Sequence, residues 1–448
     1  MRACAVSCVA MVLAVAGATG LASQAVRVLG LAECTALALA HDPGLRVNEL
    51  ESAAANARLR ELRGQYVPSV SVQAGYSRLS DVTPGSLSIQ TPLGPATAAF
   101  PASPPNSTAV KLSLQQPLFT GLRIASSIRQ ADAARASTGS DVQRSRSEVR
   151  YAVADAYWQL GKAAALERSA AEILGQLERK LSDAKTLHDQ GVATQNDVVQ
   201  AGMRLEDARI DSGRAASARE MARLRLAQLI GVPLGEPLDT LDEAAAAVPD
   251  PAPTFGHGLE ELVARALAAR PELAGARSRV LAQDAAVDVA RAGRFPTLFV
   301  TGDYLFADPN PRVFPQSDQF TGTWSVGIMA SFDIGRYPQV SAQEDQARSR
   351  AAQAREALRG QSDAITAEVI RAAILLNTAL ASYESLKKET SQAEENARYV
   401  DERFRLGVVL ESAQQDAQSL LTRARLRERT GSIDCRIAKA GLDRAVGE

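Results

Sequence analysis

The chain has 448 residues, a formal net charge of −1 and 23% charged residues. This near-neutral balance, without a long basic run, gives no reason to expect nucleic acid as a partner. Aromatic residues make up only 4% of the chain, and the stretches 118–232 and 339–448 contain no proline, so these regions, rich in Ala, Arg, Glu, Gln and Leu, predict long helices.

Residues 1–25 have the pattern of a secretory signal peptide. Val9 to Ala18 form an apolar run too short to span a bilayer, and Ser23 to Ala25 provide the small residues of a cleavage site. Cys8 follows no proper hydrophobic segment, so we expect an exported chain without a lipid anchor. No other segment has about 18 uninterrupted apolar residues, and we therefore expect no membrane-spanning helix.

Cleavage after this peptide would leave two cysteines, Cys34 and Cys435, in an oxidising compartment. One interpretation is that both are unpaired, half-buried thiols. The other is a disulfide that connects the first helix to the last. A free-thiol assay with and without reductant distinguishes these alternatives.

The first half of the chain predicts a helix, two strands and a helical hairpin. Leu31 to about Arg63 is an Ala-rich helical segment. The hydrophobic period then changes to two, which predicts strands at about 69–77 and 110–115 on either side of a Pro-, Ser- and Thr-rich loop at 81–106. After Gly121 the helical period returns to about Gln190, a rod on the order of 100 Å long.

A second helix is expected to run back along this rod from Val192 to Ile230. Rods of this length need a partner, because their apolar positions must be buried against another helix. One such stripe contains Val149, Val153, Ala156 and Leu160.

The second half repeats the same order. Leu39–Leu45 (LAHDPGL) returns as Leu267–Leu273 (LAARPEL), and Tyr66–Ser69 (YVPS) returns as Arg294–Thr297 (RFPT), both at an offset of 228 residues. Later matches, such as Gly231 with Gly447, have an offset of 216, as one shortened loop in the second copy would produce. The duplication predicts two structural units, at 31–235 and 258–448, joined by a linker at 236–257.

In this second unit the expected strands lie at about 297–304 and 323–328, with a loop at 308–319 between them. The long helix is expected at about 339–405 and its return at 408–446. A second apolar stripe contains Val369, Ala373, Leu376 and Leu380.

All four strands have one apolar face and one largely polar face. Transmembrane β-strands with a lipid-facing side have this pattern, and a half-buried strand of a soluble sheet alternates identically. Four strands cannot close a barrel, since roughly eight are needed for a filled one. Closure between subunits is therefore the favoured interpretation, and three chains would supply twelve strands.

Across nearly all of the mature chain, the sequence resembles the outer-membrane efflux protein family, the TolC family. The resemblance is carried by the two Leu-Ala-x-x-x-Pro-x-Leu openings, the Pro-led strands, the exits at Gly121 and Gly335, and the turn motifs at 191–198 and 403–408. It implies an α+β, mainly α, fold in a homotrimer. Four strands per chain would form a 12-stranded outer-membrane β-barrel, continued by a long α-helical coiled-coil tunnel across the periplasm.

The resemblance also implies a function. Such a duct passively conducts substrate that an inner-membrane RND or ABC transporter delivers through a periplasmic adaptor, in a tripartite efflux or type I secretion system. No enzyme activity and no cofactor are expected. One alternative is a soluble periplasmic coiled-coil scaffold without transport, and another is a degenerate family member that binds an adaptor without conducting.

Candidate site residues lie where the long helices reverse, at Gly191 and Gly407. Helix ends commonly require a left-handed residue, and capping alone would explain both glycines. The resemblance adds adaptor docking at these tips, with Val192, Val408 and Phe404 as exposed apolar contacts.

Two acids are candidates for a periplasmic gate. Asp197 lies six residues after Gly191, where a carboxylate complements the positive end of the returning helix. Asp416 lies nine residues after Gly407, and three copies around a threefold axis could form a cation-attracting ring. The residue six after Gly407 is Ala413, whereas family members with a charged constriction often have an acid there. A solvated acid on a helix face is the alternative for Asp416.

No catalytic or metal-binding pattern stands out. The three histidines, His41, His188 and His257, have no His or Cys neighbour at a spacing typical of metal ligands. Gly-rich phosphate loops and nucleophile elbows are also missing.

Overall fold

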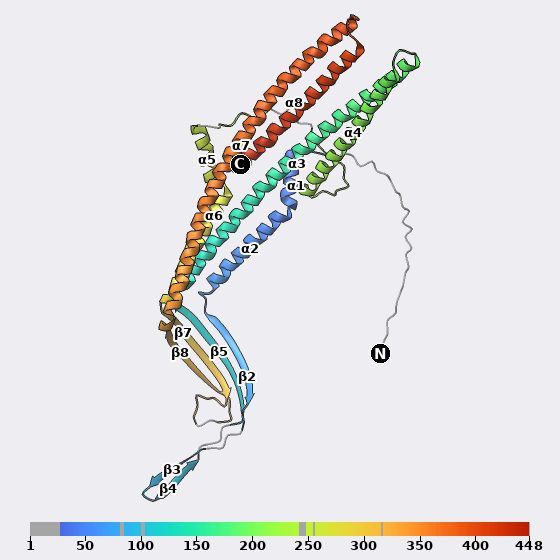
Figure 1. The fold of residues 1–448 in the computed structure, drawn as a ribbon. Helices are drawn as coiled ribbons and strands as arrows, with labels where there is room; N and C mark the ends of the chain where they lie inside the picture. The colour runs from blue at the N-terminus through green and yellow to red at the C-terminus, as the bar shows by residue number, and fades with distance from the viewer. Residues whose placement is uncertain are drawn as a thin grey trace, which may run out of the picture.

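A computed structural model describes residues 27–80, 85–99, 104–241, 248–253, 256–314 and 317–447. The signal peptide expected at 1–25 lies outside these residues. The molecule is elongated, with a β-sheet at one end and a rod of helices that extends from it (Figure 1).

Two long helices form the rod, and each is followed by a shorter helix that runs back along it. α3 (Arg123–Asp189) has 67 residues and α7 (Tyr337–Arg405) has 69. α4 (Gln195–Ile230) returns along α3, and α8 (Glu411–Val446) returns along α7. At 1.5 Å per residue each long helix spans about 100 Å, so both predicted hairpins are confirmed.

The helix expected at 31–63 is in fact two helices, α1 (Leu31–His41) and α2 (Pro43–Gly64). Pro43 cannot continue the hydrogen bonding of a preceding helix, and the carboxylate of Asp42 accepts a hydrogen bond from the backbone N–H of Leu45 at 2.6 Å. The second copy breaks at the matching proline, between α5 (His257–Ala269) and α6 (Pro271–Arg291). The repeated Leu-Ala-x-x-x-Pro-x-Leu motif is therefore a helix break.

Each returning helix ends against this break. α4 and α8 stop at Gly231 and Gly447, whose φ angles of 70° and 95° are left-handed. A Cβ atom at Gly231 would come within 2.5 Å of the His41 ring, and one at Gly447 would lie 3.4 Å from the Ala269 Cβ. Each repeat thus closes on its own first helix.

Two apolar cores lie in the middle of the rod, one along each long helix. The first joins α1, α3, α4 and α8, and its fully buried members include Cys34, Val153, Ala156, Leu160, Leu226 and Ile230. The second joins α5, α6, α7 and α8 and includes Leu262, Leu273, Ile365, Val369, Ala373 and Leu376. Both stripes predicted from the helical period therefore lie in a core, with Val149 and Leu380 at the margins.

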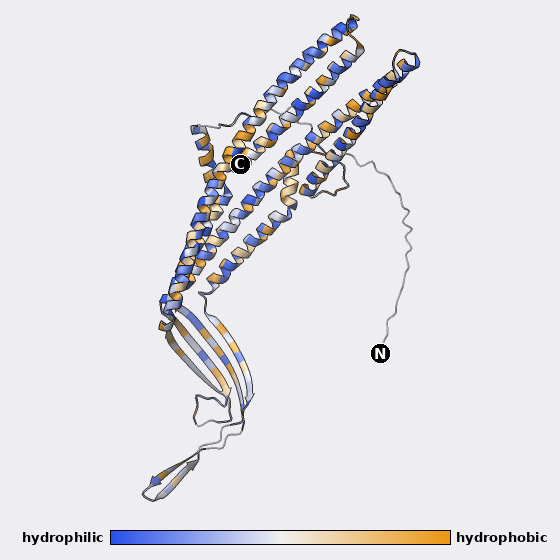
Figure 2. Cartoon of the chain, in the orientation of Figure 1, coloured by the Kyte–Doolittle hydropathy of each residue, from blue (hydrophilic) through white to orange (hydrophobic). Residues whose placement is uncertain are grey.

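The sheet contains four antiparallel strands in the order β2 (Ser69–Arg78), β5 (Asn106–Phe119), β7 (Thr297–Asp308) and β8 (Thr321–Ser331). Its register aligns apolar residues across the strands, as in the row Val72, Leu112, Tyr304 and Trp324. The next row, Ser71, Ser113, Asp303 and Ser325, belongs to the opposite face. The alternation is visible along each strand (Figure 2).

Two strand pairs were not expected. A hairpin of β3 (Ser86–Thr91) and β4 (Gly94–Ala99) lies inside the predicted loop at 81–106. β1 (Arg27–Leu29) pairs in parallel with β6 (Leu238–Thr240), which lies inside the predicted linker. β1 and β6 have three residues each, too short for a period of two to stand out.

One helical segment that the sequence analysis did not single out is long and apolar enough to cross a membrane. The helical stretch Ile334–Arg405 contains an 18-residue window with a mean hydropathy of 1.5, of which 22% is buried. By length and composition it could span a bilayer. Because α7 packs against α6 and α8 and supplies Val369 and Ala373 to the second core, we interpret it as part of the rod.

Candidate functional site

The tips of the two hairpins have the same backbone geometry. The N–H of Gly191 donates to the His188 carbonyl, and the N–H of Val192 donates to the Leu187 carbonyl, both at 2.9 Å. Gly407 and Val408 repeat these two bonds to Phe404 and Arg403, also at 2.9 Å. With φ angles of 75° and 71°, both glycines occupy the left-handed position of a Schellman cap. The capping role of both glycines is thus clear.

The tips lie at the end of the rod farthest from the sheet (Figure 1), and they expose apolar side chains. Val192 is 74% exposed and Val408 is 64% exposed. Phe404, in contrast, is only partly exposed. Leu406 and Leu410, which the sequence analysis did not single out, are each 78% exposed. Their position beside Gly407 was the signal that could have identified them.

Asp197 caps the start of α4. Its carboxylate accepts hydrogen bonds from the backbone N–H of Thr194 at 2.8 Å and from the Thr194 hydroxyl at 2.7 Å. The Asp197 N–H in turn donates to the Thr194 Oγ1, which completes a capping box. These bonds to Thr194 hold the pKa of the Asp197 carboxyl below its usual range.

Asp416 lies on α8 and faces the first hairpin. Its carboxylate is 3.9 Å from the Lys180 Nζ on α3, a contact that bridges the two hairpins. Both residues line a cavity of about 690 Å³ between α3, α4 and α8. The other charged groups of the lining are Asp207, Asp211, Arg204 and Arg423. Asp197 is not among the residues that line this cavity, so the structure does not bring the two gate candidates together there.

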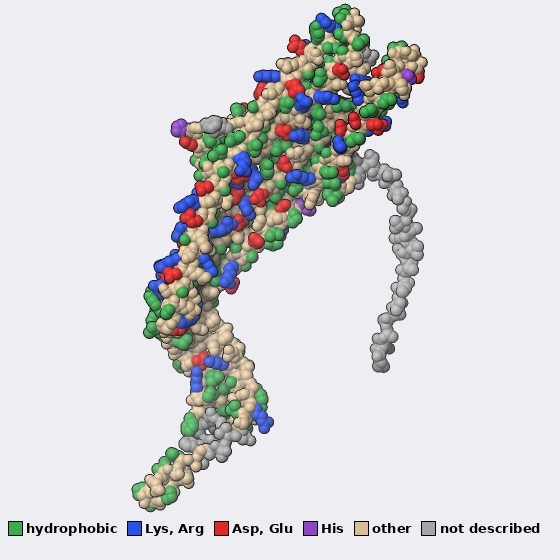
Figure 3. Space-filling view, in the orientation of Figure 1, with side chains coloured by type: hydrophobic (Ala, Val, Ile, Leu, Met, Phe, Trp, Pro, Cys, Tyr) green, Lys and Arg blue, Asp and Glu red, His purple; other side chains and the backbone are tan. Residues whose placement is uncertain are grey.

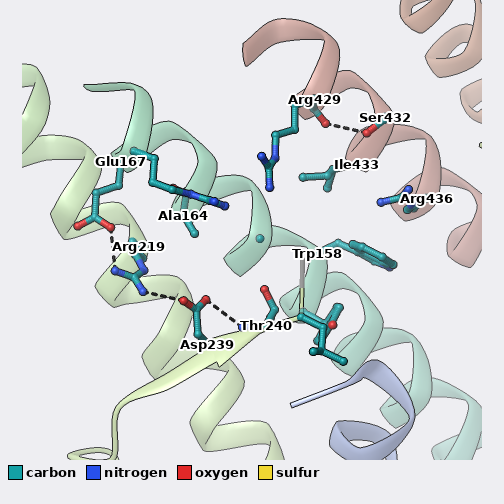
Figure 4. A pocket seen from close by; sticks show the side chains of 14 residues that line it. Trp158, Ala164, Glu167, Arg219, Asp239, Thr240, Arg429, Ser432, Ile433 and Arg436 are labelled. Carbon is teal, nitrogen blue, oxygen red and sulfur yellow. Dashed lines mark hydrogen bonds and ion pairs between the residues drawn. The ribbon is translucent and has the colours of Figure 1, made fainter. Parts of the chain in front are cut away.

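A second cavity, of about 240 Å³, lies in the middle of the rod (Figure 4). Arg219 of α4 joins two of its acids, with contacts of 2.9 Å to Glu167 on α3 and 3.1 Å to Asp239 on β6. On the opposite wall the guanidinium of Arg436 stacks over the Trp158 ring at 4.8 Å. We interpret these contacts as structural, since Arg219 holds β6 against the helices.

Cys34 and Cys435 are both fully buried, with free thiols. Their helices, α1 and α8, each pack against α3. Burial raises the pKa of the Cys34 thiol to about 11 and also raises the pKa of Cys435. The structure thus contains no disulfide between these residues. Both thiols are unpaired, as one interpretation expected, but they are fully buried instead of half-buried. Cross-linking of the two thiols stays a prediction for the free-thiol assay.

The described residues contain no group of three or more His, Cys, Asp or Glu side chains that could hold one metal ion. The sheet offers a different kind of feature, because its outer strands β2 and β8 each have one edge that pairs with no other described strand. The apolar row carries exposed Val72, Tyr304 and Trp324.

The fold is thus a four-stranded sheet with one apolar face and two open edges, which continues into two long helical hairpins. The chain belongs to the outer membrane efflux protein family, whose profile matches residues 35–232 and 262–448. The expected family membership is confirmed, and with it the localisation, in the outer membrane with an extension into the periplasm. Proteins of this family are channels of efflux systems and not enzymes.

Individual relatives agree with this assignment. The chain is 28% identical to Protein CyaE of Bordetella pertussis over 298 residues, which cover 65% of this chain and 58% of CyaE. The chain thus matches less than two thirds of that relative's length. Its fold is similar to the outer-membrane channel OprN, with a TM-score of 0.72 and 22% identity over 93% of this chain and 89% of OprN.

The outer membrane channel CmeC of Campylobacter jejuni is also similar, with a TM-score of 0.73 and 16% identity. This match covers 93% of the present chain and 85% of CmeC. At such identities, the likeness to OprN and CmeC establishes the fold alone.

Proposed function

We propose that this chain is the protomer of a trimeric exit duct, which passively conducts substrate across the periplasm and outer membrane. The register of the sheet carries this proposal, because it gives four long strands a continuous apolar face but leaves β2 and β8 with open edges. A long open edge recruits another strand, and in an outer-membrane barrel closure removes every edge.

The strand directions favour closure between copies. The sheet is antiparallel throughout and contains four strands, so β2 and β8 run in opposite directions. β8 of one copy can therefore pair with β2 of the next and continue the same alternation. This contact is head-to-tail, and a rotation that closes it produces a ring. Three copies supply twelve strands, more than the roughly eight needed to close a barrel.

The polar face supports a water-filled interior. Asp303 on β7 accepts a hydrogen bond from the Ser325 hydroxyl at 2.6 Å and forms an ion pair with Arg312 at 2.6 Å. Such groups are costly against lipid but are normal in the lumen of a channel. With the apolar face outward, the polar row would line the passage.

The remaining parts of the proposal concern partners. An inner-membrane RND or ABC transporter would deliver substrate through a periplasmic adaptor that docks on the hairpin tips. The exposed apolar side chains of Val192, Leu406, Val408 and Leu410 support docking at this place. Asp416, with its contact to Lys180 between hairpins, is the proposed gate residue.

Conductance measurements test this function directly. Purified protein in a planar bilayer should produce discrete conductance steps, and the protein in cells should fractionate with the outer membrane. A soluble periplasmic scaffold would give neither result. A family member that binds an adaptor without conducting would fractionate with the membrane, but its deletion would leave drug susceptibility and secretion unchanged.

A further inference from the structure

Arginines occupy all four joints between the sheet and the rod. Arg63 lies in the last turn of α2, and Arg123 is the first residue of α3. Arg294 and Arg336 end the short 3₁₀ helices η1 (Ala292–Arg294) and η2 (Ile334–Arg336), which connect to β7 and α7. The four joints meet at one end of the sheet (Figure 1). Positive charge is therefore repeated at one level of the molecule.

Negative charge is scarce at that level. Within the joint segments 63–68, 118–123, 292–296 and 332–337 the single acid is Asp333. Arg63, Arg123 and Arg336 are exposed, and no acidic side chain of the described residues lies within 4.0 Å of their charged groups. Elsewhere on the rod most arginines have such partners, for example Arg209 with Glu206 and Arg359 with Glu356.

Apolar and aromatic side chains are exposed at the same joints. They include Tyr66, Leu122, Phe295, Phe332, Ile334 and Tyr337. Together with Arg63, Arg123, Arg294 and Arg336 we call them the collar. The space-filling view shows basic and apolar side chains near one another where the rod meets the sheet (Figure 3).

A buried carboxylate fixes part of the collar. Glu344 on α7 is only 1% exposed and binds Arg294 at 2.6 Å, Arg348 at 2.6 Å and Arg291 at 3.2 Å. The Arg294 guanidinium also stacks over the Tyr337 ring, 5.3 Å from its centroid. Asp288 and Asp345 offset part of the positive charge of Arg291 and Arg348. Arg294 is thus held in place beside an aromatic ring, at the edge of the apolar sheet.

We propose that the collar binds the phosphate groups of anionic glycerophospholipids in the periplasmic leaflet of the outer membrane. The proposal rests on the proposed function for its orientation, with the strands in lipid and the rod in the periplasm. Tyr rings, such as those of Tyr66 and Tyr337, prefer the headgroup level of a bilayer, and the planar guanidinium matches phosphate with two parallel hydrogen bonds. Basic groups at this level attract anionic lipids in preference to zwitterionic ones.

The test compares lipids retained by the full-length protein after gentle extraction from mixed phosphatidylglycerol and phosphatidylethanolamine membranes, measured by native mass spectrometry. The collar variant is Arg63→Gln/Arg123→Gln/Arg336→Gln, which leaves Arg294 on Glu344. The matched control, Arg209→Gln/Arg214→Gln/Arg359→Gln, removes the same charge from the rod. The variant Arg63→Lys/Arg123→Lys/Arg336→Lys keeps the charge and separates lipid binding from folding.

The wild type and the control should enrich phosphatidylglycerol over the bulk ratio, and added salt should reduce the enrichment. Each arginine removed should lower the relative affinity by about fivefold, so the glutamine variant should approach the bulk ratio. The lysine variant should retain most of the enrichment. Equal enrichment in wild type and glutamine variant, or an equal loss in the control, would overturn the proposal.

A final arm distinguishes lipid from free anions. Inorganic phosphate at the same phosphorus concentration should not displace phosphatidylglycerol; displacement would show a simple anion site and overturn the lipid assignment. If the glutamine variant enriches phosphatidylglycerol as much as the wild type and the protein still conducts, lipid binding by the collar is refuted, whereas the proposed duct is not. A wild type that neither conducts nor fractionates with the outer membrane would overturn both this proposal and the duct.

Discussion

At the scale of single residues, the two repeats share backbone devices but differ in their charges. Gly191 and Gly407 occupy equivalent caps, so the tips reverse in the same way. Asp197 is used to cap α4, whereas Asp416 faces the other hairpin across a cavity. Regulation should therefore be sought at Asp416.

Conductance of two variants tests this gate. Asp416→Ala should raise the single-channel conductance, because it removes both the proposed carboxylate ring and the contact with Lys180. Lys180→Ala keeps the ring but removes the contact, so a rise in this variant would identify the contact as the closing element. Unchanged conductance in Lys180→Ala would assign the effect to the ring. If the single-channel conductance of Asp416→Ala equals that of the wild type, Asp416 is not a gate residue.

Glu344 should make the free energy of unfolding depend on pH in the acidic range. Burial favours the neutral form, but the hydrogen bond from Arg291 and the charges of Arg294 and Arg348 outweigh it and lower the pKa of Glu344 from its usual 4.5. The stabilisation is therefore present above pH 4.5 and is lost as pH falls through the lower folded-state value. Glu344→Gln should cost about 3 kcal/mol at neutral pH and much less in acid.

The measurement is the unfolding midpoint of both proteins across this pH range. A constant difference between wild type and Glu344→Gln from neutral pH to below the folded-state pKa would contradict the role of the charge. Asp345→Asn is a suitable control, because Asp345 is exposed and its contact with Arg348 lies on the surface.

At the scale of elements, adjacent residues of β2 should respond in opposite ways to charge. Val72 belongs to the apolar row and Ser71 to the polar row. Val72→Arg should destabilise the membrane-inserted protein by about 2–4 kcal/mol, as expected for arginine facing lipid. Ser71→Arg should be tolerated, since it would face the lumen. The free energy of unfolding in detergent or lipid measures both effects. Equal losses of stability in the two variants would contradict the assignment of the apolar face to lipid and of the polar face to the lumen.

The hairpin tips should respond to charge at their apolar positions. Val192→Asp/Val408→Asp should reduce co-purification with the proposed periplasmic adaptor by more than about tenfold, because each valine buried at the proposed contact would contribute about 1.5 kcal/mol or more. Gln195→Asp/Ser412→Asp adds the same charge at the same tips without removing an apolar contact, and should have little effect. If both pairs of substitutions behave alike, the apolar side chains are not the docking contacts.

Much of the architecture could be predicted at this scale because long, strongly periodic elements leave a clear signal. Both hairpins and all four strands of the sheet lie where the hydrophobic period indicated them. The break at Asp42 was missed because the Ala-rich sequence on both sides of it suggested one helix, although Pro43 disfavours a helix interior and suits the first position of a new helix. The pairing of β1 with β6 is non-local, and no local pattern specifies it.

The candidate site was predictable in part. Turn glycines identify the tips, but exposure of Leu406 and partial burial of Phe404 depend on how α7 and α8 pack. The contact between Asp416 and Lys180 joins residues of different repeats, which sequence spacing does not bring together.

At the scale of the whole molecule, duplication and oligomerisation would act together. Two hairpins per chain in three chains would give six near-equivalent hairpins around one axis. The sheet would close by the same rotation, since each chain offers one β2 edge and one β8 edge. A monomer leaves both edges and the apolar rows without partners, so membrane insertion and assembly should be coupled.

The most direct test of this closure is the native mass of the complex extracted from the outer membrane without heating. The proposal predicts a particle of three chains, with dissociation on heating and no stable one-chain form in lipid. A membrane-extracted particle of a single chain, or a soluble monomer that accounts for all of the protein, would contradict the twelve-stranded duct.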